Sequence, residues 1–439
     1  MTDFRNMMEA ALLPGEVSPL LAALESTPPV SIRQHIRKAP GELFPGSDPV
    51  PWCPTGRYLE ERPVFTLDPR FHAGAYYVQE ASGMSLWQLA PYLSAITSPR
   101  VLDACAAPGG KSTLLLDILP QNGLLVSNEV IRTRVPILAE NLARWGYGNV
   151  VVTQNDPADL GRLTEYFDVV VADVPCSGEG LFRKEPESRK KWSPAVVALC
   201  VSRQRRILSD LWPCLRQGGL LLYSTCTFNR MEDEEQVDWI RDHLGARLLL
   251  GPEKYLPHRI RGEGFFMALL EKTGTCHTGP GKSLPPGGGK KGGSPSRVPA
   301  DAPQHLEGPY SWYMKGPFLK AFPQELIPQA ELLESMLNVF HSGIAVATKK
   351  GKDWVPRADL ALALDLKKEA YPVFRVNREQ AVAFLRRDPL VFPDGTERGY
   401  LLLTYNDLPL GFVKNLGMRS NNLHPVSRRI FLSLKPSDH

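Results

Sequence analysis

Five short apolar runs alternate with helical patterns in the middle of the chain. The runs are rich in Val, Ile and Leu and have the sequences RVLDAC, GLLVSNEV, NVVVTQ, FDVVVADVP and GGLLLYST. One helical pattern begins at Ser112, and a second, after the run GLLVSNEV, extends through Arg144. Two more helical patterns cover 196–215 and 234–243, and the runs ARLLL and GFFMALL complete the region. Nearly continuous apolar runs are typical of parallel strands buried on both faces. Strand and helix in turn predict a doubly wound α/β sheet with right-handed crossovers over 91–275.

The flanking regions differ from this central part. Residues 1–90 combine one helical pattern, from Met7 to Leu24, with short proline-punctuated segments, which predicts a small irregular N-terminal domain. Residues 276–305 are rich in Gly and Pro and carry several basic side chains but no acid before Asp301, so we expect a flexible linker. Beyond it we expect an α+β subdomain over 306–385 and a strand-rich domain over 386–439.

Composition narrows the class of protein. Of the 439 residues, 43% are hydrophobic and 22% are charged, which excludes a wholly disordered chain. The net charge of +4 does not by itself require a nucleic-acid partner. The seven cysteines form no CxxC pair and the nine histidines show no ligand spacing, so we expect neither disulfides nor a metal site. Free thiols, no signal-peptide pattern and no apolar run of membrane-spanning length predict a cytoplasmic protein without membrane association.

Ligands of such sheets bind beyond the carboxyl ends of the strands. The first strand runs into DACAAPGGKS, residues 103–112. Its small residues allow the backbone to approach a ligand closely, and the amides that open the next helix can face a polar or anionic group. Taken alone, this loop is equally well explained as a tight turn between a strand and a helix.

Acidic residues follow the next two strands. Glu129 ends the second strand, where a carboxylate suits a ribose diol, and Asp156 follows the third strand, where it could accept from an adenine amino group. Either acid alone is more often a surface residue or a helix cap. Because they share one predicted rim and no full phosphate-binding motif is present, they favour a non-phosphorylated adenosine ligand, with S-adenosylmethionine as the natural candidate.

Two thiols end the fourth and fifth strands, Cys176 in DVPCSG and Cys226 in STCT. A lone cysteine is usually a small buried hydrophobe, and we interpret Cys105, Cys200 and Cys214 in this way. Strand ends are where ligands bind, so Cys176 and Cys226 are candidates for chemistry. Beside a methyl donor, a thiolate that adds to carbon 6 of cytosine makes carbon 5 nucleophilic. Such a thiolate needs nearby cations or dipoles, and spacing does not choose between the two sulfurs.

The motifs DACAAPGGKS, DVPCSGEG and STCT, together with Glu129, resemble those of the Nol/Nop/Sun family of RNA 5-methylcytosine methyltransferases. Within that family the chain is similar to the bacterial branch that acts on small-subunit ribosomal RNA. The resemblance covers most of the chain, because YYVQEASGM, SGEGLFRKEPE and LGFVKNLGMRSNN also match. It implies a Rossmann-like class I S-adenosylmethionine-dependent methyltransferase sheet with an N-terminal RNA-binding domain and a C-terminal PUA-like RNA-binding domain.

The resemblance also implies roles for individual residues. Cys226 would be the nucleophile, and Cys176 would assist elimination and product release. Asp173 and Lys111 would orient and polarise the cytosine. In DNA 5-methylcytosine methyltransferases the Pro-Cys thiol is instead the nucleophile, paired with a Glu-Asn-Val motif that this chain lacks. The residues that would bind the methyl donor or border it are Cys105, Ala106, Ala107, Pro108, Gly109, Gly110, Lys111, Glu129, Asp156 and Asp173.

Basic residues gather directly after the Cys176 loop. Residues 183–206 hold eight basic and two acidic side chains, a net charge of +6. An isolated run of this kind is most often a solvated helix face, but beside the thiols we interpret it as an RNA-binding segment. Residues 410–439, with five basic side chains and one acid, resemble the PUA module. The candidate RNA contacts are Arg183, Lys184, Arg189, Lys190, Lys191 and Arg203.

These observations together predict a monomeric RNA (cytosine-C5-)-methyltransferase that uses S-adenosylmethionine. Small-subunit ribosomal RNA is the first candidate substrate and transfer RNA the second. A ribosome-assembly factor with a vestigial catalytic domain is less favoured, because every proposed catalytic position is filled. A small-molecule methyltransferase would need neither the basic segment nor the RNA modules.

Overall fold

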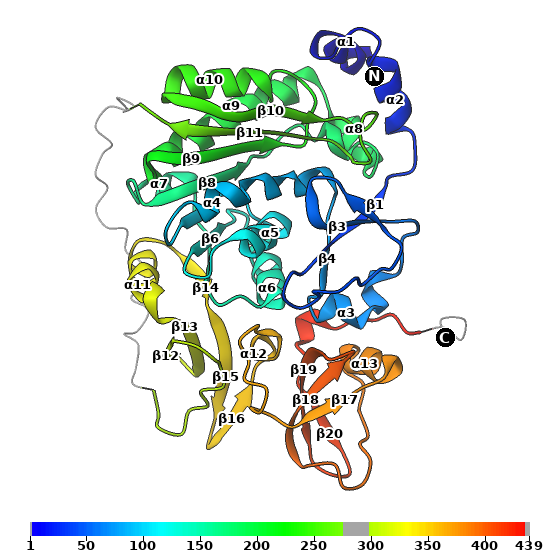
Figure 1. Cartoon of the computed structure of the whole chain (residues 1–439), viewed down its shortest axis with the longest axis vertical. Coiled ribbons are helices and arrows are strands. Elements are labelled where there is room, and N and C mark those ends of the chain that lie inside the picture. Colours follow the sequence, from blue (N-terminus) through cyan, green and yellow to red (C-terminus); the bar gives the residue numbers. More distant parts are fainter. Residues whose placement is uncertain (1, 275–297, 435–439) are drawn as a thin grey trace.

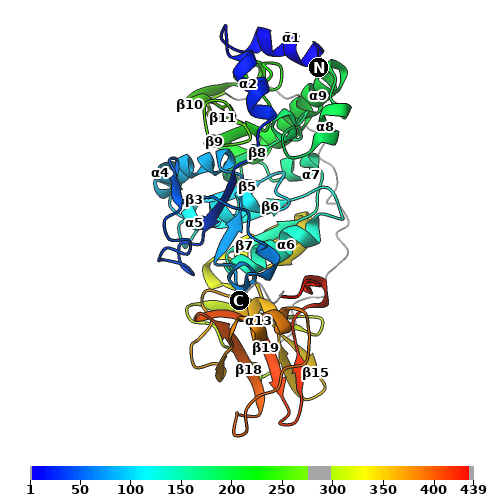
Figure 2. The same ribbon diagram turned by 90° about the vertical axis from the view of Figure 1, so that its right-hand side faces the viewer.

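The computed structural model describes residues 2–274 and 298–434 (Figure 1). Most of the expected linker, with Cys276, therefore lies outside the described residues. The molecule is elongated: a large sheet with its helices fills one half, and two smaller sheets built from the C-terminal part of the chain fill the other (Figures 1 and 2). In the described ranges, no helix has the length and apolar character needed to cross a membrane.

The N-terminal region forms a four-stranded antiparallel sheet in the order β2-β3-β1-β4. The single helical pattern expected near the N-terminus is two helices, because Pro14 and Gly15, with its φ of +88°, interrupt it. Both helices pack against Phe182 and Phe228 of the central domain. The elements are α1 (Thr2–Ala11), α2 (Val17–Leu24), β1 (Val30–Gln34), β2 (Asp48–Val50), β3 (Cys53–Leu59), α3 (Pro69–His72) and β4 (Tyr76–Val78).

The central domain contains the predicted doubly wound sheet, in the order β10-β11-β9-β8-β5-β6-β7-β14. The strands from β9 to β7 are parallel, whereas β10 and β11 are antiparallel to their neighbours. Every expected strand is present, and the ends of β5, β8 and β9 lie side by side. The bounds are β5 (Arg100–Asp103), β6 (Leu124–Asn128), β7 (Val150–Thr153), β8 (Phe167–Asp173), β9 (Leu215–Thr225), β10 (Ala246–Tyr255) and β11 (Phe265–Lys272).

Two hydrophobic cores cover the two faces of this sheet. Successive residues of a strand alternate between them: in β8, Val169 and Val171 pack with α5 and α6, whereas Val170 and Ala172 pack with α7, α9 and α10. Burial on both faces explains why these strands are almost entirely apolar in sequence. The helices are α4 (Ala90–Ser94), α5 (Gly110–Ile118), α6 (Val135–Trp145), α7 (Pro157–Gly161), α8 (Pro186–Lys191), α9 (Pro194–Leu211) and α10 (Glu234–Leu244).

The next region is joined closely to the central domain. Its strand β14 pairs with β7 in antiparallel fashion and so extends the large sheet, and Leu333 of α11 lies in one of the two central cores. The residues expected to form a separate subdomain thus complete the central sheet, while a second sheet, β12-β13-β15-β16, stands beside it. The elements are β12 (Tyr310–Lys315), β13 (Phe318–Pro323), α11 (Ile327–Met336), β14 (Val339–Ser342), β15 (Ile344–Lys350), β16 (Asp353–Pro356) and α12 (Ala358–Leu362).

The last region is a four-stranded sheet, β17-β18-β19-β20, covered by one helix. Val382 and Leu385 of that helix share a core with Leu403 of the sheet and with Leu67 of the N-terminal region. The packing unit therefore includes residues before the boundary expected at 386. Its elements are β17 (Val373–Arg375), α13 (Arg378–Leu385), β18 (Gly399–Tyr405), β19 (Leu408–Asn415) and β20 (Ser420–Asn422).

Candidate active site

The small-residue loop after β5 lies pressed against two neighbouring elements. Gly109 has a φ of +112°, and a Cβ there would come within 3.3 Å of Leu138 Cδ1 on α6. A Cβ on Gly110 would lie 3.3 Å from the Tyr77 ring, which belongs to the YYVQEA motif. Side chains at these two positions would push the loop outward. The glycines therefore let the loop pack closely against α6 and Tyr77 at the rim, where the first amides of α5 are suited to a polar or anionic group.

The two rim acids stand in different surroundings. Glu129 is buried, accepts a hydrogen bond from the Ile131 amide at 2.8 Å and pairs with Arg134 at 3.3 Å. Arg134 also donates to the Ala107 carbonyl, so it links the second strand to the small-residue loop. Asp156 is half-exposed: it caps α7 and pairs with Arg206 at 3.3 Å. Glu129 is therefore joined to the small-residue loop through Arg134, whereas Asp156 pairs with α9.

Carboxylates surround the Cys105 thiol. Burial raises the pKa of Cys105 well above its ordinary value, and the charges of Asp173, Asp103 and Glu129 act in the same direction. Cys105 thus stays protonated and is no nucleophile. The same negative field favours a positively charged group above the loop, as a sulfonium is.

Lys111 and Asp173 form an ion pair at the rim, with Nζ 2.6 Å from Oδ2. Ser224 Oγ donates to the other oxygen of Asp173 at 2.9 Å, which fixes the carboxylate across the ends of β8 and β9. Burial alone would lower the pKa of Lys111, but Asp173, with smaller contributions from Asp103 and Cys226, raises it. The ammonium is therefore charged at neutral pH, and Cys226 is among the groups that act on it.

The two candidate thiols meet, with Cys176 Sγ 3.1 Å from Cys226 Sγ. The hydrogen bond with Cys226 raises the pKa of Cys176 well above its ordinary value, and burial raises it further. The raised pKa keeps Cys176 protonated in the resting pair, with its sulfur in hydrogen-bond contact with that of Cys226. Both side chains are half-buried.

Two buried glutamates tie the thiol loops to each other. Glu179, from the Cys176 loop, accepts from the amides of Phe228 (2.6 Å) and Asn229 (3.0 Å), just beyond Cys226. Glu232, from the Cys226 loop, accepts from the Ser177 amide at 2.9 Å and from the Ser177 hydroxyl. Asn229 Nδ2 donates to both carboxylates. We call this arrangement the glutamate clasp; it fixes the distance between the two sulfurs.

The turn that carries Cys226 has a further support. The hydroxyls of Thr225 and Thr227 donate to the same oxygen of Asp233, at 2.7 and 2.9 Å. Sequence reasoning missed Asp233 and both glutamates of the clasp, as well as Arg134. Acids placed shortly after each thiol were the available signal, but spacing alone does not reveal that each one crosses to the opposite loop.

The basic segment divides into two groups of side chains. Arg183 is almost fully buried and pairs with Glu263 at 3.0 Å, and Arg189 pairs with Glu25 and donates to the Leu24 carbonyl. The structure favours a structural role for these two residues, which hold the N-terminal helices in place, rather than the RNA contact predicted from the sequence. The exposed members of the segment are Lys184, Lys190, Lys191, Arg203 and Arg206, of which Arg206 pairs with Asp156 and Asp210.

Three protein-family models match the chain. Residues 90–271 match 16S rRNA methyltransferase RsmB/F, residues 2–81 match the N-terminal domain of 16S rRNA methyltransferase RsmF, and residues 371–430 match the methyltransferase RsmF PUA domain. The chain is 31% identical to ribosomal RNA small subunit methyltransferase F of Cronobacter sakazakii, over 86% of this chain and 83% of that protein. The Escherichia coli protein of the same name is 30% identical over 86% and 84%.

Solved structures show the same central fold. A methyltransferase homolog protein from Pyrococcus horikoshii is 25% identical, with a TM-score of 0.52 over 60% of this chain and 92% of that one. NSun6 from Pyrococcus horikoshii, solved with SFG, is 20% identical, with a TM-score of 0.53 over 63% and 99%.

Proposed function

Since the chain belongs to the ribosomal RNA small subunit methyltransferase F family and is an RNA methyltransferase, we propose that it methylates carbon 5 of cytosine in small-subunit ribosomal RNA through a covalent cysteine adduct. One observation carries the proposal: two thiols lie 3.1 Å apart beside the Lys111–Asp173 ion pair. Methylation of a ring nitrogen or a ribose hydroxyl needs no sulfur nucleophile. We expect the enzyme to act in the cytoplasm, where it would meet ribosomal RNA.

The methyl donor in this proposal is S-adenosylmethionine, which supplies an electrophilic methyl group on a positively charged sulfur. The carboxylates around Cys105 suit that charge, and the two glycines let the loop backbone pack closely against α6 and Tyr77. Glu129 suits the ribose hydroxyls. Asp156 can accept from the adenine amino group once it releases Arg206.

Cys226 is the nucleophile in this proposal. The raised pKa keeps Cys176 protonated beside Cys226, which favours Cys226 as the sulfur that attacks. Its thiolate forms a bond to carbon 6 of cytosine, and the electron pair of the C5–C6 double bond makes carbon 5 nucleophilic. The Asp173 carboxylate accepts from the exocyclic amino group, while the Lys111 ammonium donates to a ring acceptor.

Cys176 acts in the second half of the reaction. In the resting pair, the hydrogen bond with Cys226 is the largest cause of the raised pKa of Cys176. That bond weakens once the sulfur of Cys226 is attached to carbon. Cys176 then loses its proton to solvent more easily, and its thiolate takes the proton from carbon 5. The C6–S bond breaks with its electron pair returning to Cys226. Between the two halves carbon 5 takes the methyl group that S-adenosylmethionine would supply, its sulfur would leave as a neutral thioether, and the net reaction releases one proton.

The test is to identify the methylated nucleoside. The protein is incubated with methyl-labelled S-adenosylmethionine and small-subunit ribosomal RNA, reconstituted small subunits or transfer RNA, and the digested RNA is analysed by liquid chromatography and mass spectrometry. We expect 5-methylcytidine in a ribosomal arm, none with Cys226→Ala, and normal product with Cys214→Ala, whose thiol is buried at the opposite end of β9 from Cys226. Another methylated nucleoside, or an active Cys226→Ala, contradicts the proposal. Product in transfer RNA alone would reassign the substrate, and binding without product would favour the vestigial factor.

A further inference from the structure

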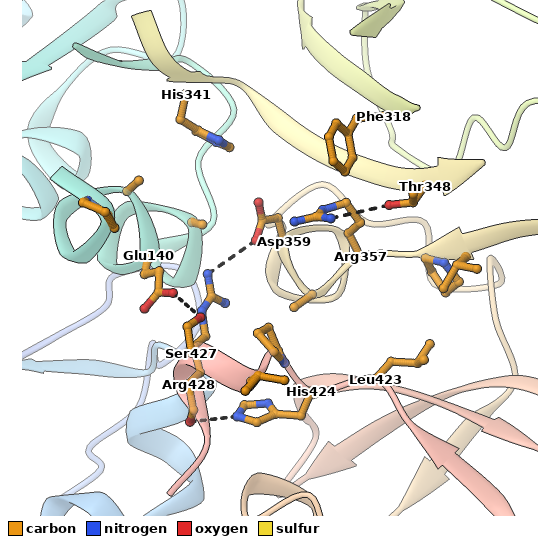
Figure 3. A pocket seen from close by; sticks show the side chains of 18 of the residues that line it. Glu140, Phe318, His341, Thr348, Arg357, Asp359, Leu423, His424, Ser427 and Arg428 are labelled. Carbon is orange, nitrogen blue, oxygen red and sulfur yellow. Dashed lines mark hydrogen bonds and ion pairs between the residues drawn. The ribbon is translucent and has the colours of Figure 1, made fainter. Parts of the chain in front are cut away.

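A cavity of about 730 Å³ lies where three parts of the molecule meet. Its walls are α6 of the central domain, the sheet of β13, β15 and β16 with α12, and the segment after β20 (Figure 3). None of these residues belongs to the thiol site. They come from regions that are far apart in the sequence, with Glu140 on one side and Arg357 and Arg428 on the others (Figure 3).

Positive charge predominates in the lining. Its four cationic side chains face only two carboxylates, those of Glu140 and Asp359. Asp359 pairs with Arg428 at 3.4 Å, and Glu140 accepts from Ser427. A cavity with two unbalanced positive charges favours an anion. The cations are Lys350, Arg357, Arg387 and Arg428.

Two of the guanidinium groups are incompletely satisfied. Arg357 donates to Thr348 Oγ1 at 3.4 Å, but its buried Nε has no partner among the described residues. Arg428 likewise leaves its buried Nε without a partner in the part of the chain that the structure describes. Buried N–H donors normally have an acceptor, so these two guanidinium groups keep hydrogen-bonding capacity that no described residue uses.

The cations behind the cavity repel one another. A smaller cavity of about 140 Å³ shares Glu140, His424 and Arg428 with the large one and continues to Arg144. Burial and the charge of Arg428 lower the pKa of Arg144 to about 10. The pKa of Lys38 is lowered to about 7 by burial, with Arg144 and Arg428 acting in the same direction. An anion at this junction would relieve the repulsion.

Aromatic surface completes the lining. Phe318 and Phe340 are exposed by 38% and 51%, and the Arg357 guanidinium stands over the Phe318 ring at 5.0 Å. Exposed rings beside arginines are suited to stack the bases of single-stranded nucleic acid while the cations bind its phosphates. A free inorganic anion would need no such rings.

The cavity also lies close to the rim of the central sheet. Arg134, which bonds the small-residue loop, comes just before α6, and Pro136 and Glu140 of that helix line the cavity. At a rise of about 1.5 Å per residue, Glu140 is about 9 Å along the axis from Arg134. One RNA strand could therefore occupy the cavity and continue to the rim.

We propose that this three-domain cavity binds a single-stranded segment of the substrate RNA, with backbone phosphates on its cations and a base against Phe340 or Phe318. This inference rests on RNA as substrate but not on the cytosine-C5 chemistry proposed above. The cavity anchors the RNA away from the reacting base, so that its loss weakens RNA binding and leaves the chemical step in place.

The test measures RNA binding directly, by fluorescence anisotropy of a labelled single-stranded oligonucleotide of mixed sequence at several salt concentrations. Because each phosphate contact releases counterions, we expect Lys350→Glu and Arg357→Gln each to weaken binding and to reduce the salt-dependence slope by about one. Phe340→Ala should weaken binding by at least about fivefold with an unchanged slope, since stacking carries no charge. Lys368→Glu makes the same charge change at an exposed site outside the cavity and should bind as wild type.

Thermal melting of each variant establishes that it is folded, and Lys350 and Phe340 are exposed enough to be replaced without loss of the core. In methylation assays on ribosomal RNA the cavity variants should raise KM while kcat stays within about twofold. Wild-type affinity and slope in all three variants would overturn the inference. A second outcome would also overturn the inference: inorganic phosphate raises the Tm of wild type but not of Arg357→Gln, and both proteins bind RNA with equal affinity. The cavity would then bind a free anion rather than RNA. Since binding needs no methyl donor, these outcomes are separate from any failure of the cytosine chemistry.

Discussion

The glutamate clasp predicts that two conservative substitutions, Glu179→Gln and Glu232→Gln, slow different halves of the reaction. Glu232 holds the loop of Cys176, whose proposed role is release of the product, and Glu179 holds the loop that follows Cys226, the proposed nucleophile. Glu232→Gln should therefore accumulate a covalent enzyme–RNA adduct. Glu179→Gln should lose activity without accumulating one.

The magnitude follows from the donors that each carboxylate accepts. Both oxygens of Glu232 accept two hydrogen bonds each, from the Ser177 amide and Gln204 on one side and from the Ser177 hydroxyl and Asn229 on the other. A glutamine presents an NH₂ group to one of these pairs, so up to two charge-assisted bonds are lost. At about 1.5 kcal/mol each, the loss is about 3 kcal/mol. If it is expressed in the release step, kcat falls about 100-fold.

The assay combines single-turnover methylation with denaturing gels that separate free enzyme from enzyme–RNA adduct. Glu235→Gln is the matched control, because Glu235 is an exposed acid on α10 and should tolerate the same change. Thermal melting separates loss of fold from loss of position. Equal adduct levels in Glu179→Gln and Glu232→Gln, or wild-type kinetics in both, would refute the idea that the clasp sets the position of the two sulfurs.

Three further predictions concern charge. Lys111→Met should lower kcat about 100-fold with little change in RNA affinity, because it removes a cation from the reacting base; steady-state methylation and RNA binding measure the two effects. Arg183→Gln leaves the buried Glu263 with only Lys184, 3.7 Å away, as an ion-pair partner and should cost about 3 kcal/mol, seen as a lower Tm, whereas exposed Lys191→Gln should keep the Tm and weaken RNA binding. Burial lowers the pKa of His35 to about 2. Below pH 6.5 the imidazole of His35 is therefore protonated in the unfolded chain but stays neutral in the native state. Stability should then fall by about 2 kcal/mol from pH 7 to pH 5, a loss that denaturant titration would show to be smaller in His35→Gln.

The gathering of the site could be predicted from sequence because it depends on a general property of parallel sheets. Cys176 and Cys226 are 50 residues apart, yet each follows the carboxyl end of a strand, and β8 and β9 are neighbours. Apolar runs located the strands, and the topology brought their ends together. The same rule placed Lys111 and Asp173 at one rim, where they form an ion pair.

The rest depends on contacts that no local pattern records. The clasp requires each glutamate to cross to the opposite loop, and β14 joins β7 from almost two hundred residues further along the chain. The charge of Arg183 made it a candidate for RNA binding, but its burial against Glu263 appears only when the N-terminal helices pack over it. The three-domain cavity could not be predicted from the sequence either, because its cations lie on separate elements that only the tertiary fold brings together.

The most direct test of the central chemistry is to locate the covalent bond in a trapped complex. Cys176→Ala enzyme is incubated with small-subunit ribosomal RNA and S-adenosylmethionine, digested with protease and nuclease, and analysed by tandem mass spectrometry. We expect a peptide in which Cys226 carries a methylated cytidine. A trapped nucleotide on Cys176 in the reciprocal Cys226→Ala variant, with nothing on Cys226, would contradict it.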